Sequence, residues 1–225
     1  MKTVVITGSS RGIGLATAQL FLDKGWRVIG TFNKTAIPLQ HKNLIRVRLD
    51  LSQPKDIAGT AKSITEHSSH IDALINNAGV ALDQKSEGID IDVIRKTFEV
   101  NLFNLVDLTQ RLVPLMAKGA HVINIDSNYG AQSLPIDDDT HVGYRLSKAA
   151  LNMYTRILAF HLKGQGVIIS SLDPGWVRTD MGYEAGDDVF QPDREADEVA
   201  QDIYDIVQTV KESGFFWRFG QKREW

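Results

Sequence analysis

The sequence predicts an α/β protein built on a doubly wound parallel sheet of about seven strands, with helices on both faces. Two observations support this fold class. Short apolar runs alternate with longer helical patterns along the 225 residues, and the apolar runs are continuous, as in parallel strands that are buried on both faces. A crossover between parallel strands is right-handed, which leaves a doubly wound sheet as the simplest architecture.

The first half of the chain carries four of the expected strands. Apolar residues at positions 13, 16, 20 and 21 have the spacing of one helix face. Pro54 suits the first turn of a helix, because the N–H that it lacks is not needed there. In order, we expect a strand over 4–7, a helix over 13–23, strands over 27–32 and 44–49, a helix from 54, and a strand over 72–75.

The second half continues the alternation. We expect a long helix over about 92–116, a strand over 121–125, a helix over about 143–164, a strand over 167–172, a helix over about 195–212, and a short strand over 215–219. The polar stretches 132–142 and 182–193 have no regular pattern and are expected to face a substrate. No repeat or linker divides the chain, so residues 1–225 are expected to form one domain.

The composition excludes several classes of function. The net charge is −3 and the pI about 6.1, so no basic field favours nucleic acid or anionic lipid. The chain has no Cys, which excludes thiolate catalysis, and its six His are scattered, so no metal site is expected. No apolar run reaches the roughly 18–20 residues of a membrane span. We therefore expect a soluble cytoplasmic protein with no nucleic-acid or membrane partner.

A glycine-rich loop, Thr7-Gly-Ser-Ser-Arg-Gly-Ile-Gly14, follows the first expected strand and opens the first expected helix. Glycine lets a pyrophosphate approach the backbone, and a helix N-terminus offers free N–H groups to phosphate. The alternative is an ordinary strand-to-helix turn, but the place of the loop after a buried strand favours nucleotide binding. The sheet is then of the Rossmann type, with cofactor contacts expected from Gly8, Ser10, Arg11, Gly12, Ile13 and Gly14.

A second motif places a tyrosine and a lysine four residues apart. Tyr144 and Lys148 lie on one face of the expected helix. A phenol has a pKa near 10, and a nearby cation lowers that pKa, which makes Tyr144 a usable acid or base. Ser127, near the carboxyl end of the fifth expected strand, would donate a hydrogen bond to a substrate oxygen on which charge develops. The two motifs together predict a nicotinamide-dependent oxidoreductase.

Six motifs occur in order along the chain: Thr7-Gly-x-x-x-Gly-Ile-Gly14, Asn76-Asn-Ala-Gly79, Asn101, Ser127-x-x-Gly130, Tyr144-x-x-x-Lys148 and Pro174-Gly175. In this combination the chain resembles the short-chain dehydrogenase/reductase family. The segment Pro174–Met181 and the ending in Trp225 look most like small carbonyl reductases of the C-factor and sniffer type. The resemblance implies that the protein interconverts a carbonyl and an alcohol by hydride transfer, with Tyr144 as general acid/base.

The resemblance also assigns residues to the adenosine half of the cofactor. Asp50, with Leu51 at the end of the third expected strand, would accept a hydrogen bond from the adenine amino group; an acid at the start of the next helix is the alternative. The ribose would be lined by Asn77, Ala78 and Gly79. Asn76, by contrast, is expected to tie neighbouring strands together.

At the nicotinamide end, the resemblance gives Lys148 a second role, to hold the ribose hydroxyls. Asn101 would hold a water that links Lys148 to solvent, although a polar residue inside a helix also often bonds the backbone. The nicotinamide itself would be contacted by Pro174, Gly175, Val177 and Thr179.

The end of the second expected strand decides between the two nicotinamide cofactors, because an acid there selects the 2′-hydroxyl of NAD. Here the place reads Thr31-Phe-Asn-Lys34, with no acid. Arg11, Asn33 and Lys34 would accept a 2′-phosphate, so the sequence predicts NADP(H) in preference to NAD(H).

Three features depart from the family pattern. Asp126 precedes Ser127, where many relatives carry a small or hydroxyl residue; it is either a solvated strand-end acid or a group that perturbs the site. The stretch from Ser127 to Tyr144 is longer than is common, and its acidic run Asp137–Asp139 is expected to be a solvated loop; the alternatives are that it rims the substrate mouth or blocks an oligomer contact. His141 is close enough in sequence to Tyr144 to touch a substrate, but an ordinary surface residue is expected.

Two other functions fit the sequence less well than a reductase. A non-catalytic NAD(P)-binding sensor or signalling protein would keep the glycine loop but would not need Ser127, Tyr144 and Lys148 together. A nucleotide-sugar epimerase or dehydratase would need a larger C-terminal region than the roughly fifty residues after Pro174. A homo-oligomer is expected, a dimer rather than a tetramer, through the two long helices that relatives commonly pair.

Overall fold

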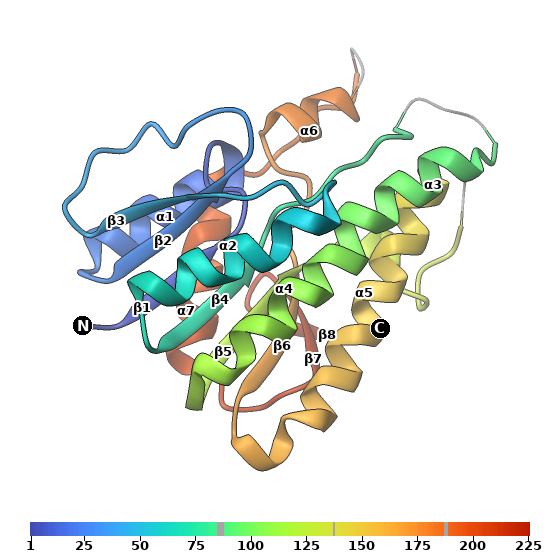
Figure 1. The fold of residues 1–225 in the computed structure, drawn as a ribbon. Helices are drawn as coiled ribbons and strands as arrows, with labels where there is room; N and C mark the ends of the chain where they lie inside the picture. Colours follow the sequence, from blue (N-terminus) through green and yellow to red (C-terminus); the bar gives the residue numbers. More distant parts are fainter. Residues whose placement is uncertain (85–87, 137, 187–188) are drawn as a thin grey trace.

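One eight-stranded sheet lies between two layers of helices in the computed structural model, which describes residues 1–84, 88–136, 138–186 and 189–225 (Figure 1). The strand order is β3-β2-β1-β4-β5-β6-β7-β8, parallel throughout except that β8 runs antiparallel to β7. The predicted doubly wound parallel sheet is therefore confirmed. The strands are β1 Thr3–Ile6, β2 Arg27–Phe32, β3 Leu44–Arg48, β4 Ile71–Asn76, β5 Met116–Ile125, β6 Ile168–Asp173, β7 Phe215–Arg218 and β8 Gln221–Arg223.

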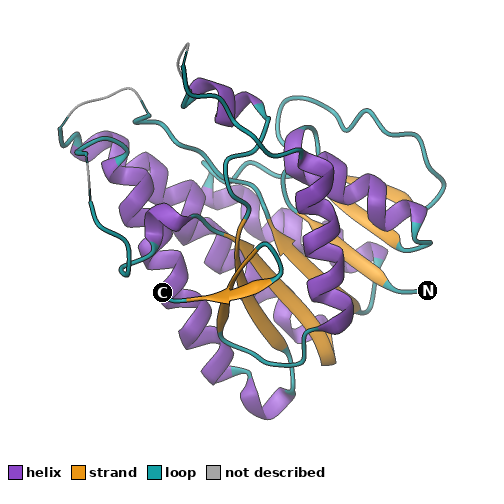
Figure 2. Ribbon diagram, turned by 180° about the vertical axis from the view of Figure 1, so that it is seen from behind, coloured by secondary structure: helices purple, strands orange, loops and turns teal. Residues whose placement is uncertain are grey.

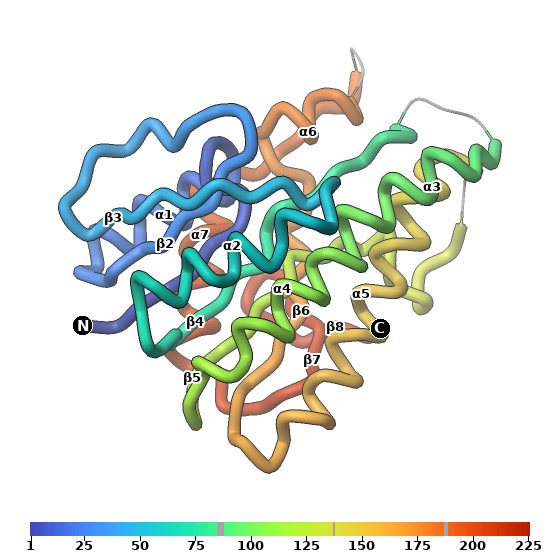
Figure 3. Tube along the Cα trace, in the orientation of Figure 1, coloured from blue at the N-terminus to red at the C-terminus, as the bar shows by residue number. Residues whose placement is uncertain are grey.

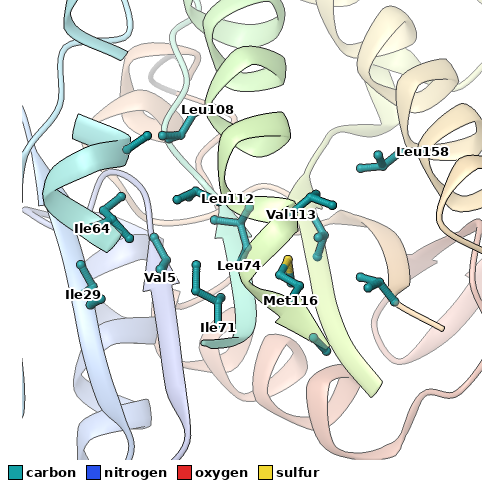
Figure 4. Close-up of a cluster of buried hydrophobic side chains, with 14 of the residues drawn as sticks. Val5, Ile29, Ile64, Ile71, Leu74, Leu108, Leu112, Val113, Met116 and Leu158 are labelled. Atoms are coloured by element: carbon teal, nitrogen blue, oxygen red, sulfur yellow. The ribbon is translucent and has the colours of Figure 1, made fainter. Parts of the chain in front are cut away.

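The continuous apolar runs form the central strands because both faces of the sheet are covered. Val5 of β1 pairs with Ile29 of β2 and Leu74 of β4, and all three side chains are fully buried. Helices α2 (Pro54–His67), α4 (Asn104–Leu112) and α5 (Val142–His161) cover one face, and Figure 4 shows part of the apolar core beneath them.

Helices α1 (Gly12–Asp23) and α7 (Ala196–Thr209) cover the opposite face (Figure 2). They come from opposite ends of the chain but pack against each other (Figure 3). Phe21 of α1 contacts Tyr204 of α7 edge to face, with ring centroids 5.3 Å apart. Among the described residues, no helix combines the length and the apolar character that a membrane crossing requires.

Four details differ from the sequence prediction. The helix expected over about 92–116 is divided into α3 (Ile91–Phe98), a π-helical turn η1 (Glu99–Phe103), α4 and a 3₁₀ turn η2 (Val113–Leu115), which contains Pro114. Strand β5 begins at Met116 because Met116 pairs with Ile71, a contact that no local pattern reveals. A short helix α6 (Asp180–Glu184) opens the second irregular stretch, and β8 adds an eighth strand.

The strand order reverses between β1 and β4, since β1 leads outward to β2 and β3 while β4 leads outward to β5 and β6. Loops at the carboxyl ends of adjacent strands diverge at such a point and leave a crevice for a ligand. The glycine loop follows β1, and the segment Asn77–Gly79 follows β4. Helix α6 and the beginning of α3 lie at the same end of the molecule (Figure 1).

Candidate active site

The glycine loop has the geometry that its glycines allow. Gly8 and Gly12 have φ angles of +72° and +53°, where a side chain is strained. A Cβ on Gly14 would lie 2.2 Å from the Gly8 carbonyl oxygen, so the loop closes tightly against the first turn of α1. That turn has no side-chain cap and no acidic residue. Its free N–H groups and the missing side chains make a cradle that fits a pyrophosphate.

Asn77 holds the glycine loop against the end of β4. Its Nδ2 donates to the carbonyl oxygens of Thr7 at 2.8 Å and Gly8 at 3.1 Å. A Cβ on Gly8 would lie 3.1 Å from Ala78. Asn76 ties β4 to β5 and α4, as expected, since its Nδ2 donates to Asn124 and Thr109. The Asn77–Gly79 segment thus borders the glycine cradle, and the side-chain amide of Asn77 helps to hold the cradle in shape.

Of the residues expected at the adenosine end, Asp50 and Asn33 lie near each other, whereas Arg11 has a different partner. Asp50 accepts from the Ser52 hydroxyl at 2.7 Å, and this bond is the main reason that its pKa is below the ordinary value, with a smaller contribution from Asn33. Lys34 is exposed beside Asn33. Arg11, however, forms an exposed ion pair with Asp180 of α6 at 2.7 Å. The sequence could not reveal this partner, which lies 169 positions away.

Helix α5 brings Tyr144 and Lys148 together beside Ser127. The Lys148 ammonium lies 5.5 Å from the centroid of the Tyr144 ring, and its Nζ donates to the Ile125 carbonyl at 2.7 Å. Ser127, which follows the end of β5, lies near enough to the Tyr144 phenol to lower its pKa. The three side chains singled out from the sequence therefore form one cluster at the carboxyl end of the sheet.

Gly130 explains why a glycine belongs three residues after Ser127. It ends the 3₁₀ turn η3 (Asn128–Gly130), which packs directly on α5. A Cβ at Gly130 would lie 2.5 Å from the backbone carbon of Lys148 and 2.7 Å from the nitrogen of Ala149. Only a residue without a side chain lets the segment that carries Ser127 lie this close to the helix that carries Tyr144.

Asn101 is the centre of the π-helical turn η1. Its side chain is 1% exposed and bonds both the N–H and the carbonyl of Val80, each at 2.9 Å, as well as Ser147 Oγ at 3.0 Å. A Cβ on Gly79 would meet Asn101 Oδ1 at 3.3 Å and Lys148 Nζ at 3.9 Å. Asn101 thus fixes the segment after β4 against α5, close to the ammonium. A π turn widens a helix by one residue and occurs frequently at functional sites.

The pKa of Tyr144 departs from the expectation that Lys148 lowers it. Burial raises this pKa well above the ordinary phenol value, and the neighbouring carboxyl groups of Asp126 and Asp173 raise it further, against the hydrogen bond with Ser127. Burial also lowers the pKa of Lys148, while Asp126 acts in the opposite direction. The phenol is therefore held in its protonated form, the form that can donate a proton.

The segment after β6 faces the glycine loop. A Cβ on Gly12 would lie 3.0 Å from Thr179 Cγ2. The Thr179 hydroxyl accepts from Gly182 N–H at 3.2 Å and so caps α6. Val177 is buried and pairs with Arg194 in an isolated parallel bridge. Gly175, with a φ of +76°, turns the chain out of the sheet after Pro174.

The prediction that His141 is an ordinary surface residue was wrong. His141 is 8% exposed and has a left-handed φ of +58°, which is uncommon for a residue other than glycine. It contacts Tyr129 and Tyr144 edge to face, with centroid distances of 5.2 and 6.5 Å. The sequence carries no sign of this contact, or of a role for Tyr129, because only the packing of η3 on α5 brings the three rings together.

The acidic run before Tyr144 was expected to be solvated. Asp137 lies outside the described residues. Asp138 and Asp139 are exposed, in agreement with a solvated loop. Asp138 also accepts from Thr140 and pairs with Arg145 at 2.7 Å, and these contacts lower its pKa to about 2. A cavity of about 350 Å³ lies between the segment that follows Ser127 and the β7–β8 hairpin, and it is bordered by Asn128, Ser133, Leu134, Asp173 and Arg218 among others.

Comparison with known proteins agrees with this arrangement. The family model described as short chain dehydrogenase matches residues 2–189. The chain belongs to this family. Among curated short-chain dehydrogenases, it is 30% identical over 233 residues to dehydrogenase/reductase SDR family member 7B of Mus musculus, a match that covers 92% of this chain and 71% of that protein.

Solved structures of short-chain dehydrogenases are similar over nearly the whole length. The NADPH-bound carbonyl reductase from chicken fatty liver is 28% identical, with a TM-score of 0.88, and the match covers 100% of this chain and 94% of that one. The NADP complex of Pseudomonas aeruginosa RhlG is 26% identical, with a TM-score of 0.85 and coverage of 96% and 94%. The protein is thus an oxidoreductase of the short-chain dehydrogenase fold.

Proposed function

We propose that the protein reduces a small carbonyl compound to an alcohol with NADPH, and catalyses the reverse oxidation with NADP⁺. The observation that carries this proposal is the cluster of Ser127, Tyr144 and Lys148, which lies at the same end of the sheet as a glycine cradle that fits a dinucleotide. A non-catalytic sensor would have no use for this cluster.

In the reduction, the cofactor supplies the hydride to the carbonyl carbon when it is bound. The Tyr144 hydroxyl donates its proton to the carbonyl oxygen, which becomes the alcohol oxygen. Ser127 donates a hydrogen bond to the same oxygen while negative charge develops there. Lys148 supplies a fixed positive charge beside the phenol, and Asn101 fixes the backbone next to that charge.

The lining of the 350 Å³ cavity includes Asn128, next to Ser127, but not Ser127, Tyr144 or Lys148, so the cavity carries no part of this proposal. Ser133 and Leu134, from the stretch expected to face the substrate, contribute to its wall. The aromatic edges of Tyr129 and His141 lie beside the reactive phenol.

We propose NADP(H) rather than NAD(H) as the cofactor. The end of β2 carries Asn33 and Lys34 and no acid that would repel a 2′-phosphate. Arg11 can reach such a phosphate by exchanging Asp180 for it, and an exposed ion pair of this kind is worth only about 0–1 kcal/mol. Titrations with NADPH and NADH test the preference; equal affinities, or an unchanged NADPH affinity in Arg11→Ala, contradict it.

A homodimer is the proposed assembly. Helix α5 exposes four large apolar side chains along one stripe: Leu146, Met153, Ile157 and Phe160. Residues with this spacing lie on one face of a helix, and a contiguous apolar patch is typical of an interaction surface.

A cytoplasmic location is also proposed, and the absence of cysteine is consistent with it.

The test of the proposed function begins with an NADPH-oxidation screen over aldehydes, ketones, quinones and 3-oxoacyl compounds. On a substrate from that screen, Tyr144→Phe should lower turnover by roughly 10²–10⁴-fold, as expected for the loss of a general acid, and should keep NADPH affinity. Tyr154→Phe is the matched control, because Tyr154 lies on the same helix and its hydroxyl accepts from Gln110. Near-normal turnover in Tyr144→Phe would exclude the proposed mechanism.

A further inference from the structure

The turn between β7 and β8 carries a bulky side chain in a backbone conformation that such residues rarely adopt. Phe219 and Gly220 form this two-residue turn, with φ angles of +51° and +72°. Positive φ angles at both positions are typical of a type I′ turn, in which Asn, Asp or Gly usually stands first. A phenylalanine with a left-handed φ is strained, and such strain persists only where the surrounding contacts outweigh it. The contacts of the ring should therefore explain its presence in the turn.

The ring of Phe219 is held by two arginine side chains. The guanidinium carbons of Arg194 and Arg218 lie 4.6 and 4.8 Å from its centroid. A cation within about 6 Å of an aromatic ring is attracted to the ring. Each arginine is anchored in turn, since Arg194 pairs with Asp202 of α7 at 2.6 Å and Arg218 pairs with Asp173 of β6 at 3.3 Å. The ring is therefore fixed in place although it is 52% exposed.

The far end of the same ring lies against the turn that follows β6. A Cβ on Gly175 would lie 2.9 Å from Cζ of Phe219 and 3.0 Å from its Cε1. Arg194 contacts the same turn, because its Nη1 donates to the carbonyl oxygen of Pro174 at 2.9 Å. The N–H of Gly175 donates to Asp173 Oδ1 at 3.0 Å. The ring and the arginines thus contact the turn Pro174–Gly175 or the residue directly before it.

This turn begins the segment that faces the glycine loop. At the other end of the segment, Thr179 Cγ2 would lie 3.0 Å from a Cβ on Gly12, so the segment reaches the glycine cradle. Only three residues separate Gly175 from Thr179. A displacement of the turn would therefore move the whole segment relative to the cradle.

We propose that Phe219 is a positioning residue for the cofactor site: its ring, together with the two arginines that hold it, fixes the turn Pro174–Gly175. The inference rests on the proposed function, in which this turn contacts the nicotinamide end of the cofactor. It assigns a role to a hairpin that lies outside the six motifs of the sequence. It also explains a strained turn that an asparagine would relieve.

The variant Phe219→Asn separates the ring from the hairpin turn. Asparagine suits the first position of a type I′ turn, so the free energy of unfolding in urea should stay equal or rise. Hydrogen exchange of the Gly175 amide, followed by NMR in the cofactor-free protein, should nevertheless be faster by roughly 5–30-fold, as expected for the loss of two cation–π contacts. Phe219→Tyr keeps the ring and should restore slow exchange.

The same variants are then compared with NADPH, first without a substrate. Phe219→Asn should bind NADPH about threefold more weakly or worse, because ordering of the turn then draws on the binding free energy. On a substrate from the screen, its turnover should fall by roughly 10–100-fold, as expected for a small misplacement of the reacting groups. Phe219→Tyr should rescue both properties.

Three results overturn the proposal. These are unchanged exchange of Gly175 in Phe219→Asn, faster exchange with wild-type NADPH affinity and turnover, and equal losses in Phe219→Tyr. If Phe219→Asn does not fold, Phe219→Gly removes the ring and the strain together. Failure of both variants to fold would show that the ring supports the fold rather than this turn, and it also overturns the proposal.

Failure of the proposed function gives a different result. The wild type itself then binds no NADPH, or Tyr144→Phe keeps its turnover. Failure of the role proposed for Phe219 leaves both of these wild-type properties intact and appears only in Phe219→Asn and Phe219→Tyr.

Discussion

At the scale of single residues, the site depends as much on missing side chains as on reactive ones. Gly130 lets η3 lie against the backbone of Lys148 and Ala149, and Gly14 lets the glycine loop close on α1. In both places the neighbour is backbone, which cannot rotate away as a side chain does. The distance from Ser127 to Tyr144 is thus set by a residue that takes no part in the chemistry.

Gly130→Ala should therefore damage both stability and turnover. A Cβ 2.5 Å from a backbone carbon forces η3 away from α5, at a cost of about 1–3 kcal/mol, and moves Ser127 from the phenol. Denaturant unfolding and turnover on a screened substrate measure the two effects. Gly164→Ala is the matched control, since a Cβ there meets nothing within 4 Å. Full turnover in Gly130→Ala would show that Ser127 needs no such support.

His121 on β5 gives a pH dependence to folding. It is 1% exposed, and burial, with a smaller contribution from Lys211, lowers its pKa from 6.5 to about 3. Between these values the unfolded chain binds a proton that the folded chain does not, so the free energy of unfolding falls as the pH drops through this range.

In His121→Gln this loss on acidification should shrink, by on the order of 1–4 kcal/mol between neutral pH and pH about 3. Urea unfolding of both proteins across the range measures the difference, with the exposed His161→Gln as control. The raised pKa of Asp126 acts in the opposite sense, but it is present in both proteins and leaves the comparison intact. Parallel curves for wild type and His121→Gln would contradict the assignment.

At the scale of elements, α5 serves two surfaces. One face carries Tyr144 and Lys148 toward the sheet, and another exposes Leu146, Met153, Ile157 and Phe160. Phe103 is also exposed on η1, which packs against α5. If two such stripes paired in a dimer, α5 would be packed against the sheet on one side and against the partner subunit on the other.

Ile157→Lys should accordingly convert a dimer into a monomer. Ile157 is 59% exposed in the middle of the stripe, and a charge there would be buried without a partner in the dimer. Light scattering should give twice 25.0 kDa for the wild type and 25.0 kDa for the variant. Ile89→Lys is the control, because it changes an equally apolar side chain, 80% exposed, that precedes α3 and is not part of the stripe on α5. A wild-type particle of 25.0 kDa would reject the assembly.

At the scale of the whole molecule, the alternation of apolar runs and helical patterns was enough to predict the sheet and its flanking helices. The strands from β1 to β7 were found because each is an apolar run bounded by a turn or a helix. Three-residue β8 has the sequence Gln-Lys-Arg, which carries no strand signal; it exists because β7 offers it an edge. The π turn at Asn101 likewise has no pattern of its own.

The candidate site was predictable where local motifs suffice and not where distant segments meet. Tyr144 and Lys148 are related by helix geometry alone. The pairing of Arg11 with Asp180, the burial of His141 and the contact of Asp126 with Ser171 each join separate parts of the chain. The direction of the Tyr144 pKa was misjudged for this reason, since the nearest cation was visible in the sequence but the burial and the carboxyl groups were not.

The two borders of the sheet have a consequence for the behaviour of concentrated protein. An open strand edge is a template for aggregation, and charged side chains on the edge oppose it. Strand β8 ends the sheet on one side with exposed Lys222 and Arg223, and β3 on the other side carries Arg46 and Arg48. Arg46 also bonds the carbonyl oxygens of Ile37 and Leu39 in the preceding loop. When two copies of the chain approach each other edge to edge, positive side chains on each edge strand repel one another. The sheet should therefore resist edge-to-edge aggregation.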